Sequence, residues 1–223
     1  MPSKNRQKIY IENGIYHIYN RGVAKLPIFL DTQDYIKFIN ILNDALTKRP
    51  LKIISFDLRG RSYKAVEKQI KNFLDEISLI AYCLMKNHFH LLIKQNSKNS
   101  MESFMRSILT RYSSYFNKKY KRVGPVFQGR YKAILITKEN YLLHLSRYIH
   151  LNPQEENVNL LKAFSSYSNY LGLRKNKWLK PKIILDYFKR EYLDEMKFYK
   201  SYQNFVEVYK GKKKRFLKNM ILE

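Results

Sequence analysis

The sequence predicts an α+β fold, in which an antiparallel sheet packs against helices. Over the first 153 residues, short stretches rich in β-branched and aromatic residues alternate with amphipathic helical stretches. Neighbouring strand stretches lie close enough along the chain to form hairpins, which join antiparallel strands. With 45% hydrophobic residues, the chain of 223 residues can also bury a sizeable core. These observations favour a sheet with helices on one or both of its faces.

The first third of the chain is predicted to hold two strands and two helices. Asp31 or Thr32 can cap the first helix, because a side-chain oxygen there accepts from the free backbone N–H groups of the first turn. Gly60 marks a turn between the second strand and the second helix. In chain order the predicted elements are a strand at residues 15–20, a helix at 34–47, a strand at 52–58 and a helix at 63–76.

The middle of the chain carries the strongest β pattern. Residues 77–94 are predicted to form two strands joined at Lys86 and Asn87. A later helix is expected to stop before Pro153, because proline cannot continue a helix. The remaining predicted elements are a helix at about 100–120, a strand at 130–137, a helix at 138–151, helices at 183–192 and 194–208, and a basic tail at 210–218.

Charge is the most informative feature of the composition. Lys and Arg number 43 against 18 Asp and Glu, which gives a formal net charge of +25. A surface this basic attracts polyanions and favours nucleic-acid binding without sequence preference. A lysine-rich coding bias is the alternative explanation. A membrane-surface role has less support, because the basic residues spread along the whole chain instead of along one amphipathic helix.

The sequence gives no sign of secretion or membrane insertion. No apolar run approaches the roughly 20 residues of a membrane helix. No apolar stretch follows the basic N-terminus, so a signal peptide is not expected. Cys83 is the only cysteine, which excludes an internal disulfide and suits a reducing compartment. We therefore expect a cytoplasmic protein.

A His-x-His pair, His88 and His90, is the first candidate site. On a strand, residues two apart point to the same face, with Cα atoms about 7 Å apart from a rise of ~3.3 Å per residue. Two imidazoles can converge on one metal ion from there, but a third ligand must come from elsewhere. The pair alone fits equally well a polar pair on the solvent face of a half-buried strand.

Tyr148 and Asn152 form the second candidate site. Residues spaced by four project from one face of a helix. A phenol and a carboxamide oxygen can serve there as nucleophile and metal ligand in metal-assisted phosphoryl transfer. Without further context, a core tyrosine and a helix-capping asparagine explain the pair more simply. His144 and His150 could also ligate a metal, but we expect them to be solvated or hydrogen-bonded histidines.

A third feature is the stretch GPVFQGRYK at residues 124–132. Its glycines flank aromatic residues, and Arg130 and Lys132 alternate after them. This arrangement suits a hairpin edge that contacts a DNA backbone. A turn followed by an exposed strand face is equally compatible with it.

In chain order these stretches resemble the single-tyrosine transposases of the HUH endonuclease superfamily, and among them the REP-associated tyrosine transposases. The resemblance covers about residues 10–155, with the motifs in the family's order and spacing. Together the matches favour the functional interpretation of both candidate sites. The matching stretches are YHIYNRG at residues 16–22, AYCLMKNHFHLLI at 81–93, RYSSYFNKKY at 111–120, VGPVFQGRYK at 123–132 and YLLHLSRYIHLNP at 141–153.

The resemblance implies a ferredoxin-like antiparallel sheet with the two histidines on a central strand. It also implies that His88 and His90 hold Mg²⁺ or Mn²⁺, with Asn152 as a further protein ligand. Tyr148 would then attack a DNA phosphate and leave a 5′-phosphotyrosyl link and a free 3′-hydroxyl. The implied substrate is single-stranded DNA next to a short hairpin.

The expected organisation is a transposase domain at residues 1–155 and a basic helical extension at 156–223, acting as a monomer or a homodimer. The stretch at about 49–75 is longer than the family's usual link, so its contacts stay open. Two other functions stay open: a non-catalytic protein that binds hairpin-forming nucleic acid, and a metal-dependent hydrolase that uses water. The predicted DNA contacts are Arg21, Arg111, Lys118, Lys119, Arg130 and Lys132.

Overall fold

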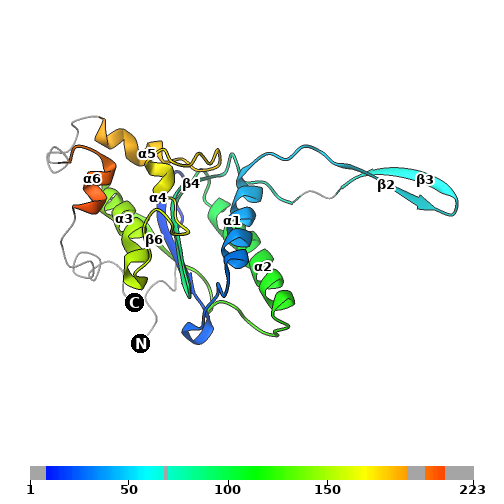
Figure 1. Ribbon diagram of the computed structural model, residues 1–223. Coiled ribbons are helices and arrows are strands. Elements are labelled where there is room, and N and C mark those ends of the chain that lie inside the picture. Colours follow the sequence, from blue (N-terminus) through cyan, green and yellow to red (C-terminus); the bar gives the residue numbers. More distant parts are fainter. Residues whose placement is uncertain (1–8, 68–69, 190–198, 209–223) are drawn as a thin grey trace.

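A four-stranded antiparallel sheet forms the centre of the computed structural model, which describes residues 9–67, 70–189 and 199–208. The strand order is β4-β5-β1-β6, and every neighbouring pair is antiparallel. The sheet and its flanking helices confirm the predicted α+β fold (Figure 1). The strands are β1 (Ile15–Arg21), β4 (Ile77–Met85), β5 (His88–Gln95) and β6 (Lys132–Ile136).

Two helices, α1 (Thr32–Leu46) and α2 (Ser100–Lys119), cover one face of the sheet (Figure 1). Phe38 of α1 and Phe89 of β5 are fully buried between these layers, in the larger hydrophobic cluster. The start of α1 is fixed as the sequence predicts, because the Asp31 side chain accepts a hydrogen bond from the backbone N–H of a residue in the first turn.

Helix α3 (Glu139–Leu151) covers the opposite face, where Leu145 and Ile149 pack in a second hydrophobic cluster. The chain after α3 joins this cluster through three short helices. These elements also line the outer edge of β4: Ser166 donates a backbone hydrogen bond to the carbonyl of Tyr82. The short helices are α4 (Tyr167–Tyr170), α5 (Lys182–Leu185) and α6 (Tyr202–Glu207).

The helices predicted at residues 183–192 and 194–208 correspond to shorter elements where the structure describes them. In the first, α5 is followed by a 3-10 turn at Asp186–Phe188. In the second, only the last part is described, as α6. The predicted basic tail at 210–218 lies outside the described residues. In the described part of the chain, no helix is long and apolar enough to cross a membrane.

The helix predicted at residues 63–76 is wrong. Strands β2 (Ile53–Leu58) and β3 (Arg61–Val66) instead form a two-stranded antiparallel hairpin, which we call the arm. Its loop is Arg59-Gly60, with φ values of 52° and 74°, and two positive φ angles give the tight two-residue turn that matches the twist of a hairpin. That turn pairs the following residues with β2 before a helix can begin.

The arm projects from the body beside α1 and away from α3 (Figure 1). At its base, the Phe73 backbone N–H donates to the carbonyl of Ala45 at 2.7 Å. The Asn72 side chain donates to the carbonyl of Thr47 at 2.6 Å. These two hydrogen bonds hold together the points where the chain leaves the body and returns to it.

A buried hydrogen-bond network around His150 joins α3 to the segments that follow it. His150 Nδ1 lies 2.6 Å from the Tyr202 hydroxyl, and its Nε2 lies 2.7 Å from Oγ of Ser166. The Tyr202 hydroxyl also donates to Oγ of Ser146 at 3.1 Å. Because both ring nitrogens are bonded and the ring is fully buried, His150 is a structural residue. Burial lowers its pKa to about 3.

We expect this histidine to make stability fall as the pH falls. Between about pH 6.5 and its folded pKa of about 3, His150 binds a proton in the unfolded chain but not in the folded one. The free energy of unfolding should therefore drop by up to about 1.4 kcal/mol per pH unit through this residue. Urea unfolding at several pH values between 7.5 and 4.5 measures this change. The free energy of unfolding should fall less per pH unit for His150→Gln than for the wild type. Equal slopes would contradict the assignment.

Candidate functional site

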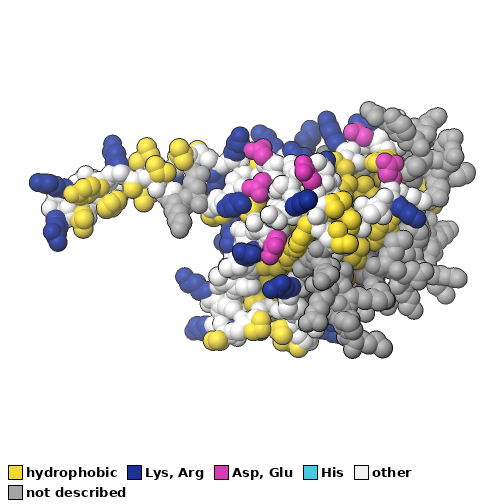
Figure 2. All heavy atoms as spheres, turned by 180° about the vertical axis from the view of Figure 1, so that it is seen from behind, with side chains coloured by type: hydrophobic (Ala, Val, Ile, Leu, Met, Phe, Trp, Pro, Cys, Tyr) yellow, Lys and Arg dark blue, Asp and Glu magenta, His cyan; other side chains and the backbone are white. Residues whose placement is uncertain are grey.

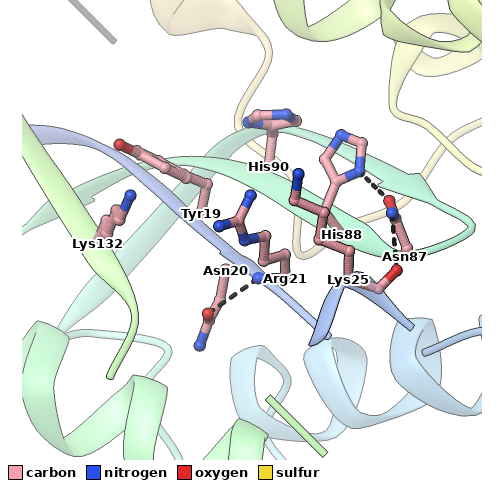
Figure 3. A pocket seen from close by; sticks show the side chains of 8 residues that line it. All are labelled: Tyr19, Asn20, Arg21, Lys25, Asn87, His88, His90 and Lys132. Carbon is pink, nitrogen blue, oxygen red and sulfur yellow. Dashed lines mark hydrogen bonds between the residues drawn. The ribbon is translucent and has the colours of Figure 1, made fainter. Parts of the chain in front are cut away.

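A cavity of about 230 Å³ opens on the face of the sheet where β1 and β5 run side by side. Tyr19 pairs with His90 and Arg21 pairs with His88, and directly opposite residues point to the same face of a sheet. The strand pairing therefore brings side chains from two distant parts of the sequence together. The cavity is lined by Tyr19, Asn20, Arg21, Lys25, Asn87, His88, His90 and Lys132 (Figure 3).

His88 and His90 lie on the same face of β5, with ring centroids 5.1 Å apart. Nδ1 of His88 lies 2.7 Å from Oδ1 of Asn87, as the dashed line in Figure 3 marks. An amide oxygen only accepts hydrogen bonds, so this contact places the proton of a neutral ring on Nδ1. The lone pair of His88 then sits on Nε2, which is the atom that a metal ion would bind.

His90 is buried, and its Nδ1 lies 2.9 Å from Nε2 of His17. Its Nε2 is buried and has no hydrogen-bond partner among the described residues. Burial lowers the pKa of His17 to about 3, and burial together with the two neighbouring histidines holds the pKa of His90 well below its usual range. Both rings are therefore neutral near pH 7. A neutral imidazole with an unpartnered nitrogen fits a metal ligand.

His17 is a residue of this site that the sequence did not reveal. It belongs to a stretch that resembles the transposases, but nothing in the sequence gave it a role. It lies on β1 directly opposite Leu92, so it shares a face with His90. Only the register of β1 against β5 shows this, and a single sequence does not specify which residues pair across two strands. Its contact fixes the ring orientation of His90, as partners of ligating histidines do.

Tyr148 lies near the end of α3 beside His90, and Asn152 is the residue that caps this helix. The half-buried ring of Tyr148 packs edge-on against His90, with centroids 5.5 Å apart, and against His17 at 6.5 Å. Asn152 is buried, and its Nδ2 donates to the carbonyl of Tyr148 at 3.0 Å, which caps the helix. The carboxamide oxygen of Asn152 makes no hydrogen bond within the described part of the chain. Capping thus leaves the carboxamide oxygen of this side chain available to another partner.

The metal site would be incomplete without such an amide. Within the described ranges, no group of three His, Cys, Asp or Glu side chains is placed to hold a metal ion. Among the described residues, a third protein ligand beside His88 and His90 would therefore be of another type. Two imidazoles and one amide oxygen are ligands that fit a divalent ion, with water or substrate completing its shell.

Three cations surround the cavity, and two of them are predicted DNA contacts. Arg21 donates from Nε to the Gln128 side chain at 2.5 Å, which holds the guanidinium at the rim. Nζ of Lys132 lies 5.4 Å from the ring centroid of Tyr19. Lys25 is the third cation, and the sequence did not single it out. Its signal is its position four residues after Arg21, in the short 3-10 turn that follows β1.

The other predicted DNA contacts do not line the cavity. Arg111 lies between the two helices of the opposite face and pairs with Asp44 at 2.7 Å. Lys119 pairs with Asp31 at 2.7 Å and with Asp34 at 2.8 Å. The positive charges of Arg111 and Lys119 are therefore neutralised by aspartates of the same protein. The exposed residues are Lys118, at the end of α2, and Arg130.

The two remaining histidines of α3 are held elsewhere. Nδ1 of His144 accepts a hydrogen bond from Arg147 at 2.7 Å. His150 lies in the buried network that joins α3 to the later helices. Neither lines the cavity, so the expectation that both are hydrogen-bonded histidines agrees with their positions.

Comparison with known proteins identifies similar sequences and folds. Residues 45–152 match a protein family described as "Transposase IS200 like". No curated protein matches the chain. Among solved structures, the chain is similar to a REP-associated tyrosine transposase bound to a REP hairpin, with 16% identity, coverage of 78% of this chain and 89% of that chain, and a TM-score of 0.51. That likeness establishes a shared fold.

A second solved structure is less similar. It comes from Deinococcus radiodurans, and its description places it among transposases. Identity is 13%, the match covers 67% of this chain and 95% of that one, and the TM-score is 0.38.

We expect His17→Leu to weaken divalent-metal binding, because it removes the partner that orients His90. Loss of such a partner typically lowers metal affinity by about tenfold or more. Isothermal titration with Mn²⁺ would measure the change. The control is His144→Gln, which alters a histidine that is bonded to Arg147 outside the cavity and should leave Mn²⁺ affinity as it is. Equal affinities for the wild type and a folded His17→Leu protein would remove His17 from this role.

Proposed function

We propose that this chain, whose residues 45–152 match the IS200-like transposase family, cuts and rejoins single-stranded DNA with Tyr148 as the nucleophile. One observation carries the proposal. The fold packs the ring of Tyr148 against the buried imidazole of His90, and Nε2 of His90 has no hydrogen-bond partner in the described part of the chain. A nucleophile beside a metal-binding histidine is the arrangement that metal-assisted phosphoryl transfer requires.

We infer that His88, His90 and the amide oxygen of Asn152 hold Mg²⁺ or Mn²⁺. When bound, such an ion neutralises charge on the phosphate and favours departure of the leaving oxygen. The protein's part is to hold both imidazole rings in a fixed orientation. Asn87 does this for His88, and His17 does it for His90.

The proposed reaction is a transesterification at phosphorus. The phenolic oxygen of Tyr148 forms a bond to the phosphate, and the bond from phosphorus to the 3′ oxygen breaks. The proton of the phenol leaves, and the departing 3′ oxygen takes up a proton. The products are a 5′-phosphotyrosyl link and a free 3′-hydroxyl. Attack by a 3′-hydroxyl on that link rejoins a strand, so no external energy source is needed.

Three cations at the cavity support a DNA substrate. Arg21, Lys25 and Lys132 come from β1, the turn after it and β6, and all three line the cavity, with Lys132 beside Tyr19 at one end of it (Figure 3). Cations that line a cavity in this way bind phosphate groups and position a backbone. The structural relative is bound to a REP hairpin. We infer that this chain also acts beside a DNA hairpin.

We further propose that the chain divides functionally at about residue 155. Residues 1–155 would carry the reaction, and residues 156–223 would support the helix that bears the nucleophile. The described part of that extension packs in the same hydrophobic cluster as α3. Its contacts with His150 lie only two residues from Tyr148.

Tyr148→Phe should abolish covalent attachment to DNA, because it removes the attacking oxygen while keeping the ring. The assay is a denaturing gel with labelled single-stranded oligonucleotides that carry a hairpin from the gene's own flanks, in Mn²⁺. Tyr141→Phe is the matched control, since Tyr141 lies on the same helix and its hydroxyl has no hydrogen-bond partner among the described residues. The control should form the adduct like the wild type.

EDTA and His88→Ala should each remove most of the adduct, because a metal ligand or the metal itself is lost. Persistence of the adduct in Tyr148→Phe would exclude Tyr148 as the nucleophile. Tight binding without any adduct from the wild type would indicate a non-catalytic hairpin binder. Free 5′-phosphate ends without an adduct would indicate a hydrolase that uses water.

A further inference from the structure

The arm, formed by β2 and β3, is the part of the described chain with the least contact to the body. All six residues of β2 are exposed, and so are five of the six in β3. Figures 1 and 2 show the arm standing away from the body. A two-stranded hairpin with no further strand or helix against it is marginally stable by itself in water. The arm therefore presents a surface that the rest of the described fold does not cover.

One face of the arm carries an exposed aromatic pair. Phe56 lies directly opposite Tyr63, and their rings stack with centroids 5.8 Å apart and an angle of 18° between the planes. These side chains are 47% and 43% exposed. Pairs two residues apart along a hairpin share a face, so the next pair on this face toward the tip is Leu58 with Arg61. An arginine thus extends the aromatic surface toward the tip.

The tip of the arm is basic. Arg59, Arg61 and Lys64 form no ion pair with any described carboxylate, whereas Lys52 at the base pairs with Glu67 at 3.7 Å. Figure 2 shows Lys and Arg side chains gathered at the end of the arm, beyond its hydrophobic side chains. The positive φ of Arg59 places it in the tight turn itself, so its backbone is fixed where the arm ends.

We propose that this face of the arm binds single-stranded DNA outside the cleavage cavity. Unpaired bases stack on Phe56 and Tyr63, and Arg59 and Arg61 contact the backbone phosphates. Aromatic rings interleaved with cations are the general means of holding single strands without sequence preference. The proposal rests on the proposed function, because it takes DNA as the substrate.

Charge decides between DNA and a second copy of the chain as the occupant. Each copy has a net charge of +25, and pairing two arms would bring their unpaired arginines toward another cationic molecule. A polyanion instead gains from every cation at the tip. The arm extends away from α3, so a strand held there lies in the flank of the DNA and not at the cleaved phosphate (Figure 1).

The test compares full-length variants for binding to hairpin oligonucleotides with a short or a long single-stranded flank, in EDTA to suppress metal-dependent cleavage. For the long flank, Phe56→Ser with Tyr63→Ser should lower affinity by about tenfold or more, as loss of a stacking platform does. The short flank should bind all variants alike. The same affinity for the long flank in this variant and the wild type would overturn the proposal.

Salt dependence isolates the phosphate contacts. Each lost contact to a single strand lowers the slope of log K against log salt by about 0.7, so Arg59→Ser with Arg61→Ser should lower it by about 1.4. The matched control is Lys175→Ser with Lys177→Ser, which removes the same charge from an exposed loop and should leave the slope as it is. Equal slopes for the two variants would also overturn the proposal.

Two further readouts separate this proposal from its rivals. Light scattering that shows a dimer for the wild type and a monomer for the arm variants would assign the arm to a second copy and overturn the proposal. Covalent-adduct formation at saturating oligonucleotide should be equal in wild type and arm variants, because Tyr148 is untouched. If the wild type forms no adduct, the proposal that Tyr148 is the nucleophile is contradicted. The binding measurements with long and short flanks still test whether the arm binds DNA.

Discussion

The register between β1 and β5 is the constraint on which the rest of this structure depends. It places Tyr19 opposite His90, and it puts His17 on the same face. A shift by one residue would turn every side chain of a strand to the other face. The histidines would then face the apolar layer under α1 and α2, where neutral rings could meet neither a metal nor DNA. One pairing thus decides both the core and the cavity.

Helix α3 is held against this sheet by hydrophobic packing and by one polar network. Leu145 and Ile149 pack toward the sheet, and His150 bonds to the segments that follow the helix. A helix fixed at its buried face has little freedom to rotate about its axis. The half-buried ring of Tyr148 is consequently kept against His90 by residues that do not touch the cavity. Precise placement of a reacting group generally relies on such outer support.

The sequence predicted the central strands and the main helices well, because their patterns are long and their end signals are local. The cap of α1 at Asp31 and the stop of α3 at Asn152 are examples. Strand β2 was predicted, but β3 was taken for a helix because Val66, Ile70 and Phe73 fit a helical spacing, and only the strand pairing excludes a helix there. Arg111 shows a second limit: its partner Asp44 lies 67 residues away, so composition alone counted its charge as available for DNA. His17 was missed for the same reason, since its neighbour His90 is 73 residues distant.

The closed base of the arm has a consequence for how such a protein can change. Asn72 and Phe73 tie the returning chain to Thr47 and Ala45, where the chain leaves the body. The segment between these points is an insertion in the fold. Changes in its length or composition need not alter the register of the sheet or the cavity. A substitution there can therefore change the surface that the protein presents to its partners while the chemistry at the cavity stays constant.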